Sequence, residues 1–333
     1  MAKSAAIILA AGQGSRMRSN LAKVLHPLAG LEMVNHVVRN VRLAAFDQII
    51  VVIGYQADKV RAVLDGVTLA EQKEQLGTGH AVDQCRDILQ EFEGPVLVTY
   101  GDTPLFRSET FQRLLEYHVQ EGASATILTA KVSDPSGYGR ILRDENNRVL
   151  GVVEHKDANQ EQRLISEINT GTYVFDSKLL FRYLAQITPH NVQAEYYLPD
   201  VLPLMINDGH KAAGFVLEDA TESMGINDRV QLAEAEAILR DRICHYWQEK
   251  GVTIIDPKST WIEWDCEIGQ DTVIYPGSFI QNNTIIGQDC VIGPNCRLSG
   301  ATLSSGVRLE SAVIVDRTIG PEEKVVPFSY FSK

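Results

Sequence analysis

The C-terminal third of the chain carries a repeat of six residues. It runs Ile262-Glu-Trp-Asp-Cys-Glu-Ile268-Gly-Gln-Asp-Thr-Val-Ile274, and aliphatic residues keep this spacing as far as Leu298. A small residue follows four positions after each of the first six aliphatic residues: Cys266, Thr272, Ser278, Thr284, Cys290 and Cys296. Hexads of this kind build a parallel β-helix, in which one apolar side chain from each short strand stacks in the interior. The sequence therefore predicts a β-helix of about three coils within residues 251–333.

Beyond Leu298 the repeat continues one residue out of phase. The same pattern then pairs Leu303 with Val307, Leu309 with Val313, and Val315 with Ile319. We expect the β-helix to stop near Gly320, because residues 321–333 do not continue the pattern.

A long helix is predicted directly before the repeat. Residues 228–249 contain no Gly or Pro and are rich in strong helix formers. Either Asn227 or Asp228 can cap the first turn, and Gly251 ends the pattern. Such a helix spans about 30 Å, so residues 229–250 are predicted to connect two domains.

Residues 1–228 alternate short apolar runs with helical patterns. The predicted buried strands are Ala5–Leu9, Ile49–Ile53, Val96–Tyr100 and Ala125–Thr129, and the predicted helices are Val34–Ala45, Asp58–Leu64, Gly79–Leu89 and Ser108–Glu121. This alternation is typical of an α/β domain with a mostly parallel sheet covered on both faces. The stretch from Tyr138 to Phe175 has strand character with little helix, and we expect an inserted, partly antiparallel region there.

Length and charge narrow the classes of function. The 333 residues leave room for two domains. The net charge of −12 argues against a general nucleic-acid binder, which needs a basic face. Residues 1–50 nevertheless hold six Lys or Arg against only Glu32 and Asp47. This local excess of positive charge indicates an anion-binding site.

The cysteines and the apolar runs exclude further classes. Five scattered cysteines without a C-x-x-C pair favour neither a disulfide framework nor a zinc ribbon, and those in the hexads are expected to fill the core. The run Ala5–Ala11 is too short to span a membrane and lacks a cleavage site. We therefore expect a cytoplasmic protein with no membrane partner.

The first predicted strand ends in a glycine-rich turn, Leu9-Ala-Ala-Gly-Gln-Gly-Ser-Arg-Met17, followed by Lys23. Glycines let a backbone approach a ligand closely, and successive N–H groups form an anion-binding concavity. Arg16 offers a fork of donors for phosphate oxygens, and Lys23 offers a point charge. A plain turn with surface cations is equally consistent with the turn alone. The pattern is neither a dinucleotide fingerprint nor a Walker A loop.

A second motif, Tyr100-Gly101-Asp102, ends the predicted strand Val96–Tyr100. Ligands of open α/β sheets bind beyond the carboxyl ends of the strands. An aspartate placed there can hold Mg²⁺, which polyphosphate chemistry requires. A simple turn before Pro104 explains the motif equally well.

The chain resembles the sugar-1-phosphate nucleotidyltransferases, and among them the bacterial N-acetylglucosamine-1-phosphate uridyltransferases. The resemblance extends from about residue 4 to about residue 320. It rests on the two motifs above and on six others in the same order: Gln75-Leu-Gly-Thr-Gly79, Gly137-Tyr-Gly-Arg140, Val153-Glu-His-Lys-Asp157, Glu167-Ile-Asn-Thr-Gly171, Glu195-Tyr-Tyr197 and Gly225-Ile-Asn227. It implies a Rossmann-like nucleotidyltransferase domain over 1–228, a connecting helix over 229–250, and a short left-handed β-helix over 251–333.

The resemblance also implies a reaction and its residues. UTP and N-acetylglucosamine-1-phosphate (GlcNAc-1-phosphate) would give UDP-GlcNAc, a cell-wall precursor, and pyrophosphate by direct attack on the α-phosphorus. The residues implied for the nucleotide are Leu9, Ala10, Ala11, Gly12, Arg16, Lys23, Gln72, Gly77, Thr78, Tyr100, Gly101 and Asp102. Arg16, Lys23 and Asp102 would be catalytic, and Gln72, Gly77 and Thr78 would recognise uracil. Helix capping by Thr78 is a compatible alternative.

The remaining implied residues bind the metal and the sugar. Asp102 and Asn227 would hold Mg²⁺, although from the residues alone Asn227 is better explained as a helix cap. Gly139, Glu154 and Asn169 would bind the GlcNAc moiety. From the residues alone, Glu154 is equally explained as a surface charge and Asn169 as part of a turn. Tyr196 and Tyr197 would either wall this pocket or belong to the core.

Alternatives of other kinds remain at this stage. The same fold serves UDP-glucose and dTDP-sugar synthesis, and a non-catalytic regulatory subunit can share the layout. The pair Ala10-Ala11 disfavours the thymidylyl branch, whose loop usually has two glycines. Full family members continue with an acetyltransferase, whose residues lie outside these 333, so we expect no acetyltransferase activity here. The β-helix is expected to form a homotrimer.

Overall fold

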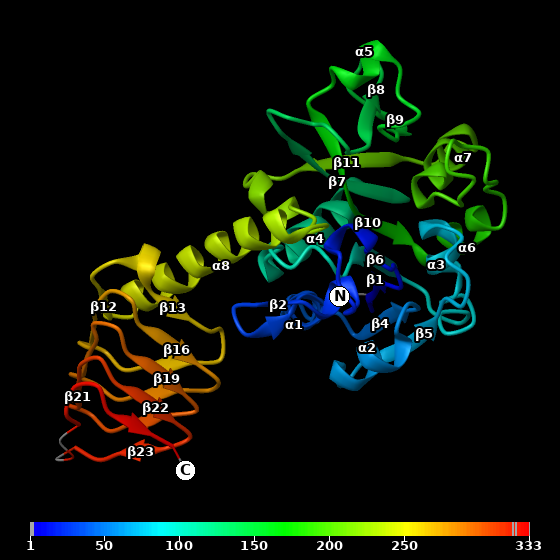
Figure 1. The fold of residues 1–333 in the computed structure, drawn as a ribbon. Coiled ribbons are helices and arrows are strands. Elements are labelled where there is room, and N and C mark those ends of the chain that lie inside the picture. Colours follow the sequence, from blue (N-terminus) through cyan, green and yellow to red (C-terminus); the bar gives the residue numbers. More distant parts are fainter. Residues whose placement is uncertain (1–2, 322, 324, 333) are drawn as a thin grey trace. The chain divides into compact units, whose positions relative to one another are not determined.

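The structure is a computed structural model that describes residues 3–321, 323 and 325–332. The chain divides into two compact units, one of Met1–His26 with Met33–Asn227 and the other of Pro27–Glu32 with Asp228–Lys333. Figure 1 shows the sheet of the first unit and the stacked strands of the second. Within the described residues, none of the helices has both the length and the apolar composition of a membrane-spanning segment.

A nine-stranded sheet organises the first unit. Its strand order is β11-β7-β10-β6-β1-β4-β5, with β8 beside β10 and β9 beside β8. The strands are β1 (Ala5–Ala10), β4 (Gln48–Ile53), β5 (Thr68–Glu71), β6 (Pro95–Tyr100), β7 (Ala125–Lys131), β8 (Arg140–Arg143), β9 (Val149–Val153), β10 (Glu167–Asp176) and β11 (Ala212–Val216). Strand β1 is parallel to β4 and β6, whereas β10 is antiparallel to β6, β7 and β8. The predicted mostly parallel sheet with an antiparallel region is confirmed.

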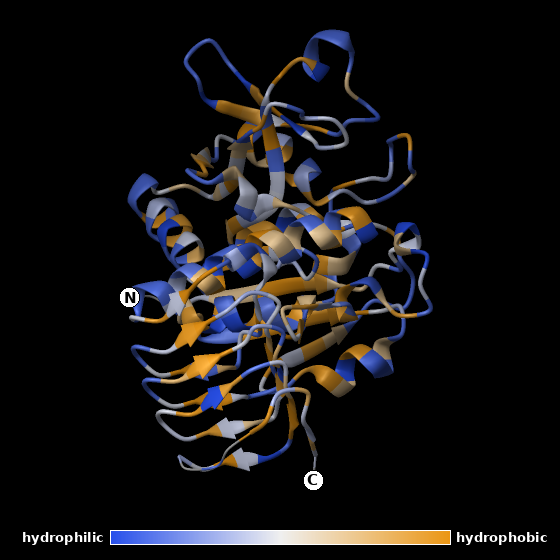
Figure 2. Ribbon diagram, turned by 60° about the vertical axis from the view of Figure 1, so that its left-hand side comes forward, coloured by the Kyte–Doolittle hydropathy of each residue, from blue (hydrophilic) through white to orange (hydrophobic). Residues whose placement is uncertain are grey.

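Alternation along β1 explains why both faces of the sheet are covered. Ala5, Ile7 and Leu9 pack into one hydrophobic cluster, and Ala6 and Ile8 into the other. Successive side chains of a strand point to opposite faces, so a strand that is apolar throughout needs a layer on each side. The strands of this sheet are accordingly among the most hydrophobic parts of the ribbon in Figure 2.

Helices supply these two layers. Helices α1, α2 and α4 contribute to the cluster around Ile8, and α3, α6 and α7 to the cluster around Ile7. Their bounds are α1 (Met33–Leu43), α2 (Ala57–Val63), α3 (Thr78–Asp83), α4 (Ser108–Glu121), α5 (Gln160–Arg163), α6 (Ser177–Leu184) and α7 (Val201–Asn207), with 3₁₀ turns η1 (Ser15–Met17), η2 (Lys23–Leu25), η3 (Leu198–Asp200) and η4 (Ala220–Ser223). Helix α3 is shorter than the predicted Gly79–Leu89, because backbone bonds such as Cys85 N–H to the Val82 carbonyl (3.0 Å) tighten the chain into turns.

The predicted long helix is α8 (Arg229–Glu249). Its cap is Asp228, whose carboxylate accepts hydrogen bonds from the N–H groups of Val230 and Gln231, both at 2.9 Å. Asn227, the other candidate, does not cap this helix. The strands β2 (Pro27–Leu28) and β3 (Leu31–Glu32) form a hairpin in the same unit, where Ala29 N–H donates to Glu236 Oε2 at 2.9 Å.

The hexad region forms a left-handed parallel β-helix with three faces. The faces are β12-β15-β18-β21, β13-β16-β19-β22-β24 and β14-β17-β20-β23. Their strands are β12 (Thr253–Ile254), β13 (Trp261–Ile262), β14 (Glu267–Ile268), β15 (Val273–Ile274), β16 (Phe279–Gln281), β17 (Ile285–Ile286), β18 (Val291–Ile292), β19 (Arg297–Ser299), β20 (Thr302–Leu303), β21 (Arg308–Leu309), β22 (Val313–Val315), β23 (Thr318–Ile319) and β24 (Tyr330–Phe331), with η5 (Pro257–Ser259) between β12 and β13. The first, second and third strands of each face complete three turns, and β21–β23 add a fourth beyond the expected three.

The repeat and its later slips decide which side chains are inside. The predicted aliphatic residues from Ile262 to Leu298 are all buried, as are the six small residues that follow them. The prediction for Val313 and Val315 is wrong, because both are only half buried and Ile314 between them is fully buried. The spacing shortens to five between Leu309, Ile314 and Ile319, which moves the interior position by one residue.

The end of the chain also differs from the prediction. Tyr330 and Phe331 pair in parallel with Val313 and Ile314, so the tail adds a strand to one face of the β-helix after the predicted stop near Gly320. All five cysteines are free and buried, which confirms that those in the hexads fill the core. In the part of the chain that is described, no cluster of three or more His, Cys, Asp or Glu is arranged for a metal.

Candidate active site

The glycine-rich turn follows β1 and leads into η1. Gly14 has a φ of +67°, and a Cβ placed on it would lie 2.4 Å from Lys23 Cβ. A side chain at this position would therefore both strain the backbone and displace Lys23. Gly12 has open space where a Cβ would stand, so the backbone beside it is accessible to a ligand. Arg16 lies on η1 with an exposed side chain.

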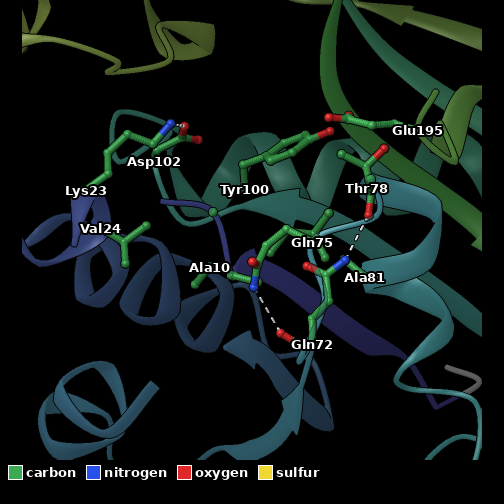
Figure 3. Close-up of a pocket in the computed structure, with 14 residues that line it drawn as sticks. Ala10, Lys23, Val24, Gln72, Gln75, Thr78, Ala81, Tyr100, Asp102 and Glu195 are labelled. Carbon is green, nitrogen blue, oxygen red and sulfur yellow. Dashed lines mark hydrogen bonds and ion pairs between the residues drawn. The ribbon is translucent and has the colours of Figure 1, made fainter. Parts of the chain in front are cut away.

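Three side chains from distant parts of the chain meet beside this turn. Lys23 Nζ forms an ion pair with Asp102 Oδ2, and both side chains are largely buried, at 14% and 16% exposure. Lys23 Nζ also donates to Asn227 Oδ1 at 3.1 Å, and Arg16 donates to the same oxygen at 2.9 Å. Figure 3 shows Lys23 and Asp102 pointing toward one another. Two oxygens, one carboxylate and one amide, thus converge on a single cation.

This convergence fits a divalent metal. Mg²⁺ prefers oxygen ligands and is commonly held by one or two protein groups together with substrate phosphates. Asp102 and Asn227 supply two such oxygens, and the Lys23 ammonium marks the point where positive charge is stabilised between them. The residues present therefore suit the metal that the sequence predicts.

A cavity of about 270 Å³ extends from these groups. It is lined by Leu9, Ala10, Ala11, Gly12, Lys23, Val24, Gln72, Gln75, Gly77, Thr78, Ala81, Tyr100, Asp102 and Glu195. Ten of these are residues that the sequence assigned to the nucleotide: the four of the turn, with Lys23, Gln72, Gly77, Thr78, Tyr100 and Asp102. Arg16 and Gly101 are assigned residues that do not line it.

The end of the cavity away from Asp102 is formed by the loop before α3. Gln72 is buried, and its Nε2 donates to the Gly77 carbonyl at 3.0 Å, while Gln75 Nε2 donates to the Gln72 carbonyl at 3.2 Å. Thr78 does not cap α3 with its side chain. Its hydroxyl oxygen instead accepts a hydrogen bond from Leu198 N–H at 2.9 Å. The loop therefore presents a set of fixed amide groups to the cavity (Figure 3).

Tyr100 lies between this cavity and a second group of predicted residues. A Cβ on Gly171, which has a φ of +80°, would come within 2.3 Å of the Tyr100 ring, so only glycine leaves room for it. Burial raises the pKa of Tyr100 well above its usual range, and the carboxylates of Glu154 and Asp102 add to the effect. Tyr100 is therefore a neutral hydroxyl at physiological pH.

The second group surrounds Gly139. A Cβ on Gly139 would lie 2.9 Å from Glu154 Oε1 and 3.3 Å from Asn169 Cβ, so the three predicted sugar residues are in contact. Asn169 Oδ1 also accepts from Gly171 N–H at 2.9 Å, which is the turn that the alternative interpretation proposed. Burial raises the pKa of Glu154, and the carboxylates of Asp157 and Asp200 raise it further.

The structure also reveals residues that sequence reasoning did not select. Gln75 and Glu195 line the cavity, although both stand in motifs that were quoted for the resemblance. Their membership in these two motifs was the signal from which both residues could have been predicted. Tyr196 packs against the hydrophobic cluster around Ile7, which supports the core alternative for this residue. The hydroxyl of Tyr197 is buried and has no hydrogen-bond partner among the described residues.

Two family descriptions match the chain, nucleotidyl transferase over residues 5–254 and the bacterial transferase hexapeptide with six repeats over residues 265–300. The bifunctional protein GlmU of Exiguobacterium sibiricum is 48% identical over 326 residues, which are 98% of this chain and 73% of that protein. The chain belongs to the GlmU family. The GlmU protein of Halalkalibacterium halodurans is 45% identical over 331 residues, 99% of this chain and 73% of its own length, and that of Geobacillus thermodenitrificans is 47% identical over 331 residues, 99% and 72%.

A solved structure supports the fold of this GlmU family member. It is a Bacillus anthracis protein assigned to the glucose-1-phosphate thymidylyltransferases, with a TM-score of 0.58 and 23% identity over 72% of this chain and 96% of that chain. At this identity the likeness concerns the fold alone. Membership of the GlmU family makes the chain a nucleotidyltransferase enzyme, a UDP-N-acetylglucosamine diphosphorylase. The predicted resemblance is confirmed, and the alternative of a non-catalytic subunit is set aside.

Proposed function

We propose that the chain transfers a uridylyl group from UTP to GlcNAc-1-phosphate. A phosphate oxygen of the sugar phosphate attacks the α-phosphorus of UTP. The bond from that phosphorus to the bridging oxygen breaks, and pyrophosphate leaves with the electron pair. No covalent enzyme intermediate is required, because such chemistry depends mainly on positioning and charge stabilisation.

The observation that carries this proposal is the arrangement of one cavity. Its lining joins the backbone of the glycine-rich turn and the Lys23–Asp102 pair to the side-chain amides of Gln72 and Gln75. Cations and backbone N–H groups suit a triphosphate, and fixed amides suit the donor and acceptor edge of a base. A nucleoside triphosphate is the ligand whose two ends match this distribution.

Each part of the chain then has a distinct role. Leu9, Ala10, Ala11 and Gly12 hold the nucleotide with their backbone, as Tyr100 and Gly101 do beside them. Gln72, Gly77 and Thr78 recognise uracil. Arg16 and Lys23 stabilise the negative charge that grows on the departing pyrophosphate. Gly139, Glu154 and Asn169 hold the GlcNAc moiety, with the Glu154 carboxylate accepting from sugar hydroxyls.

Asp102 and Asn227 are proposed to hold Mg²⁺. When bound, the ion would neutralise phosphate charge, and Arg16 and Lys23 would add to this neutralisation. Lys23 bonds both oxygens in this structure, so it must share them or turn toward the phosphates when the ion binds.

Three further expectations belong to this proposal. The β-helix is proposed to assemble a homotrimer, and light scattering that gives a monomer would refute it. The cytoplasmic location remains a prediction. So does the lack of acetyltransferase activity in these 333 residues, which an acetyl-CoA assay with glucosamine-1-phosphate tests. The matched relatives are named bifunctional, and the chain covers 72–73% of their length.

The decisive experiment measures pyrophosphate release over a panel of nucleoside triphosphates and sugar phosphates. We expect release to require UTP, GlcNAc-1-phosphate and Mg²⁺ together. Equal kcat/KM with glucose-1-phosphate would refute the sugar assignment, and equal kcat/KM with dTTP would refute the base assignment.

A further inference from the structure

Arg140, on β8, is a buried guanidinium that has no role in the function proposed so far. Only 1% of the residue is exposed. The carboxylates of Asp134 and Glu154 act on its charge at a distance, but its hydrogen bonds go to other groups. Its Nε has no hydrogen-bond partner among the residues that the structure describes. A buried charge whose counter-ions are not in direct contact with it is costly, and such departures from good packing tend to occur where function requires them.

The hydrogen bonds of Arg140 connect three separate segments. One terminal nitrogen donates to the Tyr138 carbonyl. The other lies 3.4 Å from His155 Nδ1 and 3.4 Å from the Arg163 carbonyl. The first segment is the turn before β8, the second follows β9, and the third is the end of α5. A guanidinium is suited to this task, because its donors diverge from one rigid plane.

Two of these three segments carry predicted sugar residues. Gly139 directly follows Tyr138, and Glu154 directly precedes His155. Gly139 and Glu154 are closely packed, since a Cβ on Gly139 would lie 2.9 Å from Glu154 Oε1. The Arg140 charge also acts on the Glu154 carboxylate, where it opposes the rise in pKa that burial causes. Arg140 thus fixes the backbone next to each residue without contacting the sugar position itself.

We propose that Arg140 is a positioning residue that clamps the turn at Gly139 to the segment at Glu154 and so shapes the subsite for the sugar phosphate. The subsite rests on the function proposed above, whereas the clamp rests on the hydrogen bonds of Arg140 alone. Removing the clamp lets Glu154 and Gly139 move apart. Binding of the sugar phosphate should weaken more than binding of the nucleotide, which the other side of Tyr100 receives.

Arg143 offers a matched control on the same strand. Its side chain is also largely buried, at 18% exposure, and bonds both oxygens of Glu167 at 2.6 and 2.8 Å. These partners lie outside the segments that Arg140 joins, and so does Asn147, whose carbonyl accepts a third bond from Arg143 at 2.9 Å. Arg140→Met and Arg143→Met should both lower thermal stability, so a general loss of structure affects both variants alike.

The kinetic test compares KM for the two substrates in these variants. For Arg140→Met we expect KM for GlcNAc-1-phosphate to rise about tenfold or more, because small displacements of binding groups are costly. KM for UTP should stay within about twofold. Arg143→Met should leave the ratio of the two KM values unchanged. An equal rise in both KM values for Arg140→Met, or the same split in Arg143→Met, overturns the proposal.

Hydrogen exchange measures the clamp without any substrate. In Arg140→Met, amides of residues 137–139 and 154–163 should exchange faster, and in Arg143→Met they should match the wild type. Arg140→Lys should restore part of the protection, because one ammonium reaches fewer of the three partners. Unchanged exchange in Arg140→Met overturns the clamp. Wild-type enzyme that uses another sugar phosphate overturns the proposed function instead, and the exchange result still decides the clamp.

Discussion

Lys23 Nζ donates to Asn227 Oδ1 at 3.1 Å, although 204 positions separate the two residues in the chain. The next residue, Asp228, turns its carboxylate to the first N–H groups of α8. Two neighbouring polar residues therefore have different tasks, one in the candidate active site and one in capping a helix. This division gives a direct way to separate catalysis from stability.

Replacing each of these residues by alanine should produce opposite effects. Asn227→Ala removes an oxygen that faces Lys23 and Arg16, and we expect kcat/KM to fall about 10²-fold with little change in thermal stability. Asp228→Ala removes the cap and should destabilise by about 1 kcal/mol while activity stays within a few fold. Steady-state kinetics and thermal unfolding followed by circular dichroism measure both. If Asp228→Ala is the inactive variant, the assignment of Asn227 to the site is wrong.

Asp102→Asn should weaken metal binding and catalysis together. The amide keeps the shape of the carboxylate but loses the charge that attracts both Lys23 and a divalent ion. We expect kcat to fall about 10²-fold or more and the Mg²⁺ concentration for half-maximal rate to rise. Binding of Mn²⁺ in the presence of UTP, followed by electron paramagnetic resonance, tests the site without turnover. Glu93→Gln, in an exposed ion pair with Lys178, is the control and should change neither quantity. Mn²⁺ affinity that survives in Asp102→Asn contradicts the assignment.

The sequence predicted those parts of the fold that depend on local repetition. The spacing of six from Ile262 to Leu298 places the aliphatic side chains of the interior, because each short strand contributes one of them to the core. It failed at Val313 and Val315, where one residue fewer per strand shifts the interior to Ile314. A slip of one position reverses which side chain is inside, and nothing in the local pattern distinguishes adjacent β-branched residues.

The site was predictable only in part, for a related reason. Motifs indicated which residues have suitable chemistry, but not which of their atoms meet. The contact of Lys23 with Asn227 depends on tertiary structure, and so does the capping of α8 by Asp228 rather than by its neighbour. Arg140 is a clearer case, since its motif position gives no sign that the guanidinium joins three segments.

Gly171→Ala tests the close packing of Tyr100. The new methyl group would meet the ring at 2.3 Å in a backbone conformation with a φ of +80°, so strain and overpacking both apply, each costing about 1–3 kcal/mol. Gly209→Ala is the control, because its φ of +85° imposes a similar strain while nothing lies within 4 Å of the added carbon. We expect the larger loss of thermal stability, and a loss of activity, only for Gly171→Ala. Equal losses in the two variants would show that the ring has room to move.

Asp200 should give the stability of the protein a specific pH dependence. Burial, and then the carboxylate of Asp157, raise its pKa from 3.8 to about 6. Between pH 3.8 and about 6, the folded protein retains a proton on Asp200 that the unfolded chain releases. The contribution of Asp200 to stability is therefore complete below pH 3.8 and is lost as the pH rises through about 6.

Asp200→Asn removes this dependence by keeping the side chain neutral. At pH 8 the variant should be more stable than the wild type by about 1 kcal/mol, a value reduced for the partial exposure of the group. At pH 5, where most of the wild-type side chain is protonated, the gain should be much smaller. Thermal unfolding at both pH values provides the comparison, with Glu93→Gln as the control. Its partner Lys178 holds the pKa of Glu93 below the usual range, so that substitution should bring no gain at pH 8. An Asp200→Asn variant that is destabilised equally at pH 5 and pH 8 would mean that the ionised carboxylate is well accommodated beside Asp157.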